Sequence, residues 1–281
     1  MNGQNEETPE ARALALRQGL DLLRAGRPRE AATALEAVAL AAGEASREDT
    51  RLRALALDGL GRARLALGDA RAALSALREA AELAAGGGRD LLPLRCALLQ
   101  NLCFALSETG APRESAAVGL EAARLAEDLY GAQSPELAGA LLRLSAAPYR
   151  ARDLAGAEAL ILRAKAIWEA QPGPLPEQVA TCLNNLGRIR EELGDMAAGI
   201  AFHREAVALR RNFADKGDLA FSLGNLGVAL AQDGQWREAC AALEEALETY
   251  AALGRGDSRE ARGYAANLDI CRAALNEEPQ Q

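Results

Sequence analysis

The sequence is poor in aromatic residues and in several residue types that carry chemistry. Phe, Trp and Tyr make up 4% of the 281 residues, and His203 is the single histidine. No two cysteines have the Cys-x-x-Cys spacing, and no second histidine exists, so the ligand set of a zinc site is missing. The glycine run 86–88 lacks the lysine of a phosphate-binding loop. We therefore predict no metal, no cofactor and no catalytic residue, and a structural role for His203.

Positive charge and long apolar runs are also scarce. The net charge of −8 argues against general nucleic-acid binding, which needs a basic surface. No apolar run is long enough to cross a bilayer, and the first ten residues are polar and acidic rather than a signal peptide. The five cysteines stand singly, as in reduced proteins. We expect a soluble, cytoplasmic protein with no membrane partner.

Good helix formers dominate what is present. Hydrophobic residues make up 49% of the chain, and most of them are alanine and leucine. Arginine and glutamate, which also favour helices, supply most of the charge. This composition predicts an all-α protein.

The chain repeats itself with a period of about 42 residues. The segment 181–195 and the segment 221–234 both carry Leu-x-x-Leu-Gly followed seven residues later by another glycine. Aligning every copy on that second glycine gives a turn position spaced by 42, 42, 42, 42 and 40 residues: Gly26, Gly68, Gly110, Arg152, Gly194 and Gly234. Small residues recur seven positions before most of these turns, at Gly19, Gly61, Cys103, Ser145, Gly187 and Gly227. Small residues at fixed positions allow two helices to approach closely, so each period predicts a helix pair.

These positions resemble the tetratricopeptide repeat family, in the 42-residue form of kinesin light chains and many bacterial regulators. The resemblance covers about residues 10–276, although the family's aromatic positions are mostly leucine or alanine here and its terminal proline is missing. It implies a right-handed superhelical α-solenoid of six antiparallel helix pairs and a C-terminal capping helix. It also implies a non-catalytic scaffold that binds protein or peptide partners on its concave surface.

The expected boundaries follow from the turns and the helix breakers. Tails are predicted at 1–9 and 277–281, and a capping helix at about 257–275. The pairs are predicted at about 10–43, 50–85, 92–130, 135–170, 175–212 and 215–253. The fourth pair is irregular, because Arg152 replaces the turn glycine and Pro148 lies inside the first helix. Pro148 should kink that helix, either as a tolerated bend or as a device that shapes the groove.

One position on the first helices carries a ladder of asparagine and arginine. It lies opposite the leucines of the helix, and by resemblance it faces the inner groove. An asparagine amide suits a bound peptide backbone, since it offers both a donor and an acceptor. Two structural alternatives stay open: a solvated polar face, or asparagines that bond one another and tie the helices together. The ladder consists of Arg17, Gly59, Asn101, Arg143, Asn185, Asn225 and Asn267.

Further arginines lie beside the ladder and indicate the kind of ligand. Arg62 and Arg188 stand on the same stripe, and guanidinium groups pair well with carboxylates. The predicted groove therefore consists of Asn101, Asn185, Asn225, Asn267, Arg17, Arg62, Arg143 and Arg188, and an acidic or carboxylate-bearing segment is the predicted ligand. The alternative is that these charges form an ordinary solvated face. A structural or self-associating subunit of a larger complex is the alternative function.

Overall fold

The computed structural model describes residues 8–42, 46–173, 175–213 and 216–277, and every regular element in these ranges is a helix. The chain divides into two compact units, residues 1–160 and 161–281, and helix α9 (Leu154–Glu169) contains the division. The prediction of an all-α protein is confirmed. Parts of both predicted tails, residues 1–7 and 278–281, lie outside the described residues.

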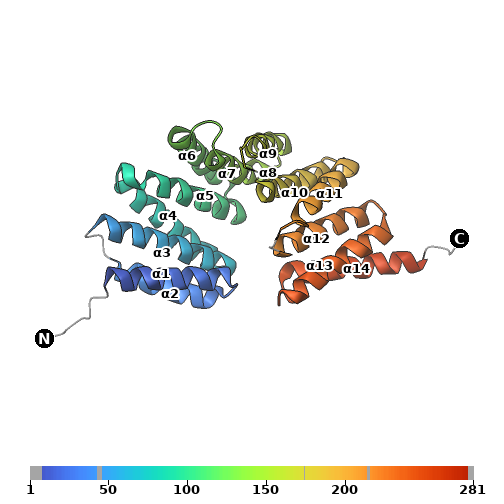
Figure 1. The fold of residues 1–281 in the computed structure, drawn as a ribbon, viewed down its shortest axis with the longest axis horizontal. Helices are drawn as coiled ribbons and strands as arrows, with labels where there is room; N and C mark the ends of the chain where they lie inside the picture. Colours follow the sequence, from blue (N-terminus) through green and yellow to red (C-terminus); the bar gives the residue numbers. More distant parts are fainter. Residues whose placement is uncertain (1–7, 43–45, 174, 214–215, 278–281) are drawn as a thin grey trace. The chain divides into compact units, whose positions relative to one another are not determined.

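Unit 1 is built from helix pairs that follow one another along the chain (Figure 1). Each helix packs against the next, and α1, α3, α5 and α7 also contact one another. These first helices therefore form one layer, with the second helices behind them. The helices are α1 (Pro9–Arg24), α2 (Pro28–Ala41), α3 (Arg47–Ala66), α4 (Ala70–Gly86), α5 (Leu92–Glu108), α6 (Pro112–Tyr130), α7 (Pro135–Leu144) and α8 (Ala146–Arg150), with a short 3-10 turn η1 (Arg89–Leu91) before α5.

Unit 2 continues the same plan. In this unit α10 contacts α12, and α12 contacts α14, while α11 and α13 each pack between consecutive first helices. The last helix ends at Glu277, slightly later than predicted, so Asn276 is helical rather than part of a turn. The helices are α10 (Pro176–Glu192), α11 (Met196–Arg210), α12 (Lys216–Gln232), α13 (Trp236–Ala252) and α14 (Arg259–Glu277).

The turn inside each pair requires a left-handed backbone. Five of the six predicted turn positions are glycine, with φ between 71° at Gly26 and 83° at Gly194, where the missing Cβ removes the steric cost. Arg152 takes the same conformation with φ of 66°, although an L side chain is strained there. The backbone thus keeps the repeat geometry even where the sequence departs from it.

Close packing within a pair depends on the small residue that precedes the turn. A Cβ added to Gly61 would lie 2.6 Å from Leu77 Cγ, and one added to Gly227 would lie 2.6 Å from Leu243 Cγ. In the third pair the glycine is on the second helix instead of the first, and Gly119 faces Cys103. The two helices of a pair therefore pack so closely that one of them must carry a small residue at the contact point.

The fourth first helix is broken. Helix α7 ends at Leu144 and α8 begins at Ala146. Ser145 lies at the break, and its hydroxyl donates to the Leu142 carbonyl at 2.7 Å. Pro148 has no N–H to donate to Leu144, so the expected interruption occurs within one turn of the proline.

Candidate functional site

The ladder position lies on the first-helix layer of both units. In unit 1 it is carried by α1, α3, α5 and α7, and in unit 2 by α10, α12 and α14. Within unit 1 a cleft of about 570 Å³ opens on this layer. Its wall includes Arg62, Asn101, Phe104, Glu108 and Arg143. Three of the eight predicted groove residues are thus brought together at one cleft.

Asp58 organises the polar part of this cleft. It is 7% exposed on α3. Asn101 Nδ2 on α5 donates to Asp58 Oδ1 at 2.7 Å, and Arg62 Nε lies 3.2 Å from Asp58 Oδ2. Burial raises the pKa of Asp58, while Arg62, Asn101 and Arg143 act to lower it. One buried carboxylate therefore joins two groove residues from neighbouring repeats.

Arg143 completes the cleft from α7. Its guanidinium carbon lies 5.1 Å from the centre of the Phe104 ring, within range of a cation–π contact. Phe104 keeps 38% of its surface exposed. Arg150 of α8 forms an ion pair with Glu108 of α5 at the same end. The cleft therefore offers guanidinium groups around one accessible aromatic ring.

Arg17 stands apart from this cluster. It is exposed on α1, and it is absent from the lining of the cleft that holds Arg62, Asn101 and Arg143. The ladder of unit 1 is thus interrupted between its first and third members, because Gly59 occupies the position between them.

The ladder residues of unit 2 have different surroundings from one another. Asn225 Oδ1 accepts a hydrogen bond from the Tyr264 hydroxyl at 3.2 Å, and Asn267 Nδ2 donates to the Gly263 carbonyl of its own helix at 2.9 Å. The Asn185 amide is half-buried and forms no hydrogen bond within the described residues. Arg188 is exposed on α10. Among the described residues no two ladder asparagines bond to one another; Asn225 and Asn267 bond to other groups, and Asn185 bonds to none.

A second polar cluster lies inside unit 2, between α10, α11 and α12. His203 is fully buried. Its Nδ1 lies 3.1 Å from Asn184 Oδ1, and its Nε2 lies 2.7 Å from Glu191 Oε1. Asn184 Nδ2 donates onward to Ser222 Oγ at 2.8 Å. His203 therefore links both helices of its own pair and, through Asn184, the next pair.

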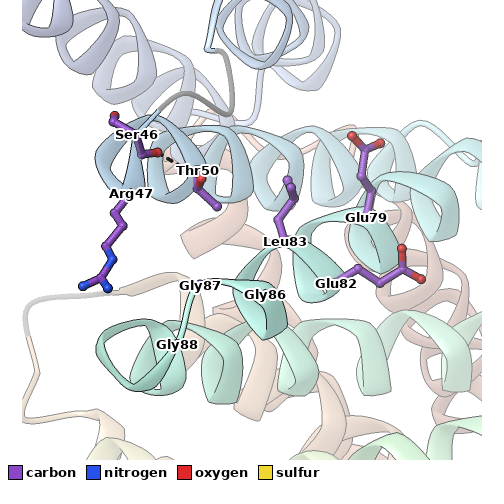
Figure 2. Close-up of a pocket in the computed structure, with 9 residues that line it drawn as sticks. All are labelled: Ser46, Arg47, Thr50, Glu79, Glu82, Leu83, Gly86, Gly87 and Gly88. Atoms are coloured by element: carbon purple, nitrogen blue, oxygen red, sulfur yellow. Dashed lines mark hydrogen bonds between the residues drawn. The ribbon is translucent and has the colours of Figure 1, made fainter.

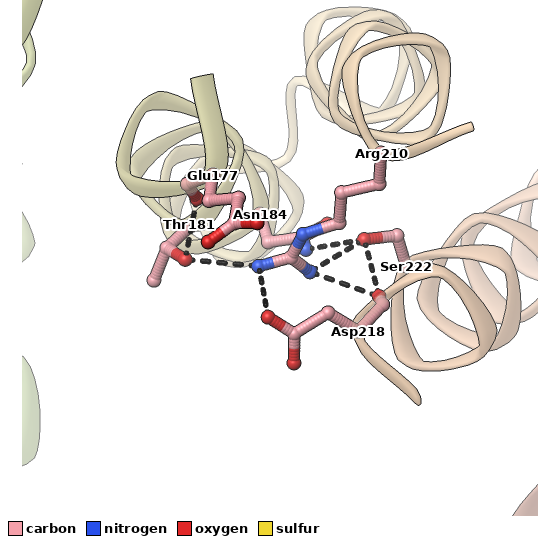
Figure 3. Close-up of polar contacts among 6 residues, drawn as sticks. All are labelled: Glu177, Thr181, Asn184, Arg210, Asp218 and Ser222. Carbon is pink, nitrogen blue, oxygen red and sulfur yellow. Dashed lines mark hydrogen bonds and ion pairs between the residues drawn. The ribbon is translucent and has the colours of Figure 1, made fainter. Parts of the chain in front are cut away.

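Arg210 closes this network from the end of α11 (Figure 3). It is 4% exposed, and it donates to Ser222 Oγ at 2.7 Å, to the Asp218 carbonyl at 3.0 Å and to Thr181 Oγ1 at 2.9 Å. Arg210 also forms an ion pair with Asp218 Oδ2 at 3.6 Å, so a buried cation ties α10, α11 and α12 together. His203 and Arg210 are both buried, so we regard the network as structural.

A larger cleft of unit 1 lies at its edge rather than on the ladder face. It measures about 760 Å³ and lies between the start of α3 and the end of α4, beside residues 86–88 (Figure 2). Two of its charged groups are engaged in ion pairs, Glu79 with Arg53 and Arg47 with Asp90. The Ser46 side chain caps α3 by accepting from Asp49 N at 3.0 Å. This cleft is therefore lined by groups that stabilise the fold locally.

Metal and membrane features can be described for the residues that the structure covers. No group of three or more histidine, cysteine, aspartate or glutamate side chains is arranged to hold a metal ion there. No helix among the described residues is long and apolar enough to span a bilayer. All five cysteines are buried as free thiols, and burial raises the pKa of Cys182 to about 12.

Part of the chain matches a known family. Residues 178–252 match the tetratricopeptide repeat family model, which confirms the resemblance for α10 to α13. No curated protein matches the sequence significantly.

Solved structures extend the similarity of fold to the whole chain. A putative kinesin light chain of Podosopora anserina with TPR-like repeats is 19% identical, with a TM-score of 0.53 over 75% of this chain and 98% of that one. Rap protein complexed with Competence and Sporulation Factor is 12% identical, with a TM-score of 0.63 over 96% and 87%. NprR in complex with its cognate peptide NprX is 11% identical, with a TM-score of 0.67 over 98% and 76%. At these identities the likeness establishes the fold alone.

The sequence analysis missed the buried polar residues beneath the ladder. Asp58 and Asn184 occupy the same position of the repeat, immediately before the ladder residue. Leucine occupies that position in the first and fourth pairs, at Leu16 and Leu142. A charged or amide side chain at a position that takes leucine in two other repeats was the available signal.

Proposed function

We propose that this chain, whose residues 178–252 match the tetratricopeptide repeat family, is a non-catalytic scaffold that binds an extended peptide or protein segment on its first-helix layer. The observation that carries the proposal is the unit 1 cleft, where Arg62, Asn101 and Arg143 surround the exposed ring of Phe104. Such a surface combines hydrogen-bonding groups for a backbone with an apolar site for a side chain.

The charge of the cleft supports an acidic ligand. Arg62 and Arg143 are countered by Asp58, and Arg150 is countered by Glu108. The Arg62–Asp58–Arg143 group therefore keeps one net positive charge, although the whole chain carries −8. An aspartate or glutamate side chain, or a terminal carboxylate, would be attracted to this group.

In unit 2, Asn185 supports hydrogen bonding to the backbone of a bound peptide. The Asn185 side-chain amide lies on the first-helix layer of unit 2 and has neither its donor nor its acceptor engaged within the described residues. An extended peptide presents one carbonyl and one N–H per residue, so a single amide side chain can bond both. Two proteins of similar fold are complexed with Competence and Sporulation Factor and with the peptide NprX, which favours a peptide as the ligand.

The test compares variants of the ladder in partner capture. Asn185→Ala, alone and with Asn225→Ala, should lower capture of the wild-type partners from lysate by about tenfold, the worth of the pair of hydrogen bonds that Asn185 would lose. Asn276→Ala, an exposed asparagine outside the ladder, is the matched control and should capture normally. Circular dichroism checks that each variant is folded. Equal capture by wild type and the double variant would overturn the groove.

Charge is tested separately. Arg62→Ala with Arg143→Ala should weaken binding of a captured segment and reduce its dependence on salt concentration, because both effects come from the same cations. Arg17→Ala is the control, since Arg17 is exposed on the same layer outside the cleft. An unchanged salt dependence would show that the ligand is not held by this cluster.

The alternative, a self-associating subunit, has one observation in its favour. Helix α14 exposes 59% of Ile270, with Ala266 and Ala273 exposed on neighbouring turns. Light scattering over a concentration series distinguishes the two functions. A defined oligomer that Ile270→Asp dissociates, and that Asn185→Ala leaves intact, would favour the alternative.

A further inference from the structure

We infer that Asp58 is a positioning residue for the unit 1 cleft, which it prepares to accept a backbone N–H beside an acidic group of the ligand. The inference rests on the proposed function, because it specifies how one part of the binding layer recognises a peptide. Asp58 acts through Asn101 and Arg62, the two groove residues that it contacts.

The first step is the orientation of the Asn101 amide. An ionised carboxylate can only accept hydrogen bonds, so the Asn101 atom 2.7 Å from Asp58 Oδ1 is the donor Nδ2. The carbonyl oxygen of Asn101 is therefore turned away from Asp58, and it bonds no other group among the described residues. At the cleft Asn101 presents an acceptor, which selects a donor such as a peptide N–H.

The second step is the placement of positive charge beside that acceptor. Arg62 contacts Asp58 through Nε and keeps 44% of its side chain exposed, so its terminal nitrogens stay accessible for a carboxylate. Arg143 is held over Phe104 on the next first helix. An N–H acceptor and two guanidinium groups thus line one cleft, the arrangement expected for a backbone segment that carries an acidic side chain.

The third step is that packing does not require a charge at this position. The first and fourth repeats place Leu16 and Leu142 there, both at least partly buried. Replacing a buried ion pair by an apolar side chain of similar size is often neutral or stabilising. The contacts of Asp58 with Asn101 and Arg62 therefore explain a carboxylate at this position better than core packing does.

The orientation is measured first, without any ligand. In the free wild-type protein the side-chain amide of Asn101 should show a downfield proton that exchanges slowly with water, since a carboxylate holds it. Asp58→Leu should remove this signature, and Asp58→Asn should weaken it, because the neutral amide oxygen is a weaker acceptor than a carboxylate. Asp21→Asn is the control, because Asp21 pairs with Arg24 on the surface of the same unit. Identical Asn101 signals in wild type and both Asp58 variants would overturn the inference.

Recognition of the N–H is measured with two probes that differ only in the backbone. One is a fluorescein-labelled hexapeptide of aspartate, and the other is the hexamer of malic acid, which keeps the carboxylates and replaces every N–H by an ester oxygen. The ratio of their dissociation constants reports preference for the N–H. That ratio should fall by about three- to tenfold in Asp58→Leu, the worth of one hydrogen bond.

The same ratio separates positioning from a general structural effect. Asn101→Ala should lower it as much as Asp58→Leu does, and combining the two should lower it no further, because both act on one hydrogen bond. Additive effects, or a ratio unchanged in Asp58→Leu, would overturn the inference. If wild type binds neither probe, the acidic-ligand part of the proposed function fails, and the amide signal of Asn101 still decides the role of Asp58.

Discussion

Asp58 in unit 1 and Asn184 in unit 2 occupy the same position of the repeat, and they serve different parts of their units. Asp58 contacts ladder and stripe residues on the first-helix layer, Asn101 and Arg62. Asn184 contacts His203 on the second helix of its own pair and Ser222 on the next first helix. A polar residue at this position can therefore connect neighbouring first helices or link the two helices of one pair.

The residues opposite these two positions explain the difference. In the fifth repeat His203 takes the place that Leu35, Leu77 and Leu243 hold in other repeats, so Asn184 finds a hydrogen-bonding ring within the pair. In the second repeat that place is Leu77, which offers no polar atom. Asp58 consequently reaches the next repeat, where Asn101 supplies a donor.

The largest effect is expected when the unit 2 network is broken. Asn184→Ala should lower the free energy of unfolding by about 2–4 kcal/mol, because His203 Nδ1 and Arg210-bound Ser222 lose a buried partner. Urea unfolding measures the loss of stability. Thiol labelling that is faster at Cys182 in unit 2 than at Cys103 in unit 1 would show that unit 2 opens first. Asn185→Ala, one residue along the same helix, should cost about 1 kcal/mol or less. Equal costs for the two changes would contradict a structural network.

Glycine replacements compare packing in the two units. Gly187→Ala should cost about 1–3 kcal/mol, since the added Cβ would lie 2.6 Å from His203 Nε2, and the bonded ring cannot move away. Gly139→Ala on α7 meets only Gln100 Oε1 at 3.4 Å, so the gain in helix propensity, up to about 1 kcal/mol, should appear there. Thermal unfolding of both variants gives the comparison.

Changes at two turn positions should have smaller effects on the free energy of unfolding, and these effects should be opposite in sign to one another. Arg152→Gly in unit 1 should raise the free energy of unfolding by about 1 kcal/mol, because glycine removes the steric cost of φ 66°. Gly194→Ala in unit 2 should lower it by a similar amount for the same reason. The sign of each change in urea unfolding checks the shared turn geometry. A destabilised Arg152→Gly would mean that contacts of the arginine outweigh the strain.

The smallest effect is the pH dependence contributed by Asp58. Burial raises the pKa of Asp58 in the folded state above the ordinary 3.8. At pH values between these two pKa values, Asp58 is protonated in the folded state and ionised in the unfolded state. The contribution of protonated Asp58 to stability is complete below 3.8 and disappears as pH rises through the folded pKa. In Asp58→Asn the free energy of unfolding should not fall between pH 3.8 and the folded pKa, whereas in Asp21→Asn it should fall as in wild type. Urea unfolding across acidic pH tests the difference.

The repeat plan was predictable from the sequence because it depends on local requirements. A turn that needs positive φ favours glycine, and a close helix pair needs a small residue, so both recur at fixed spacing. The broken helix near Pro148 follows from one missing N–H. The division into two units gave no comparable signal in the sequence, and the helix boundaries at residues 257–277 were predicted only approximately.

The candidate site was predictable only in part. Helical periodicity placed the ladder on one layer, yet it could not show that Asn101 bonds Asp58 or that Asn225 bonds Tyr264. Those partners lie 43 and 39 residues away in the chain, and side-chain contacts between repeats depend on how neighbouring helices pack. Arg62 and Arg143 line one cleft, whereas Arg17 lies outside it.

The sequence by itself determined the all-α repeat, its turns and the layer on which polar side chains stand, because each depends on spacing within one chain segment. The tertiary structure decided what those side chains do. Asp58 and Asn184 have the same place in the repeat, and the groups brought opposite them, Asn101 in one case and His203 in the other, decide which helices each residue connects. Hydrogen bonds are short and directional, so their partners are fixed by packing rather than by position in the repeat.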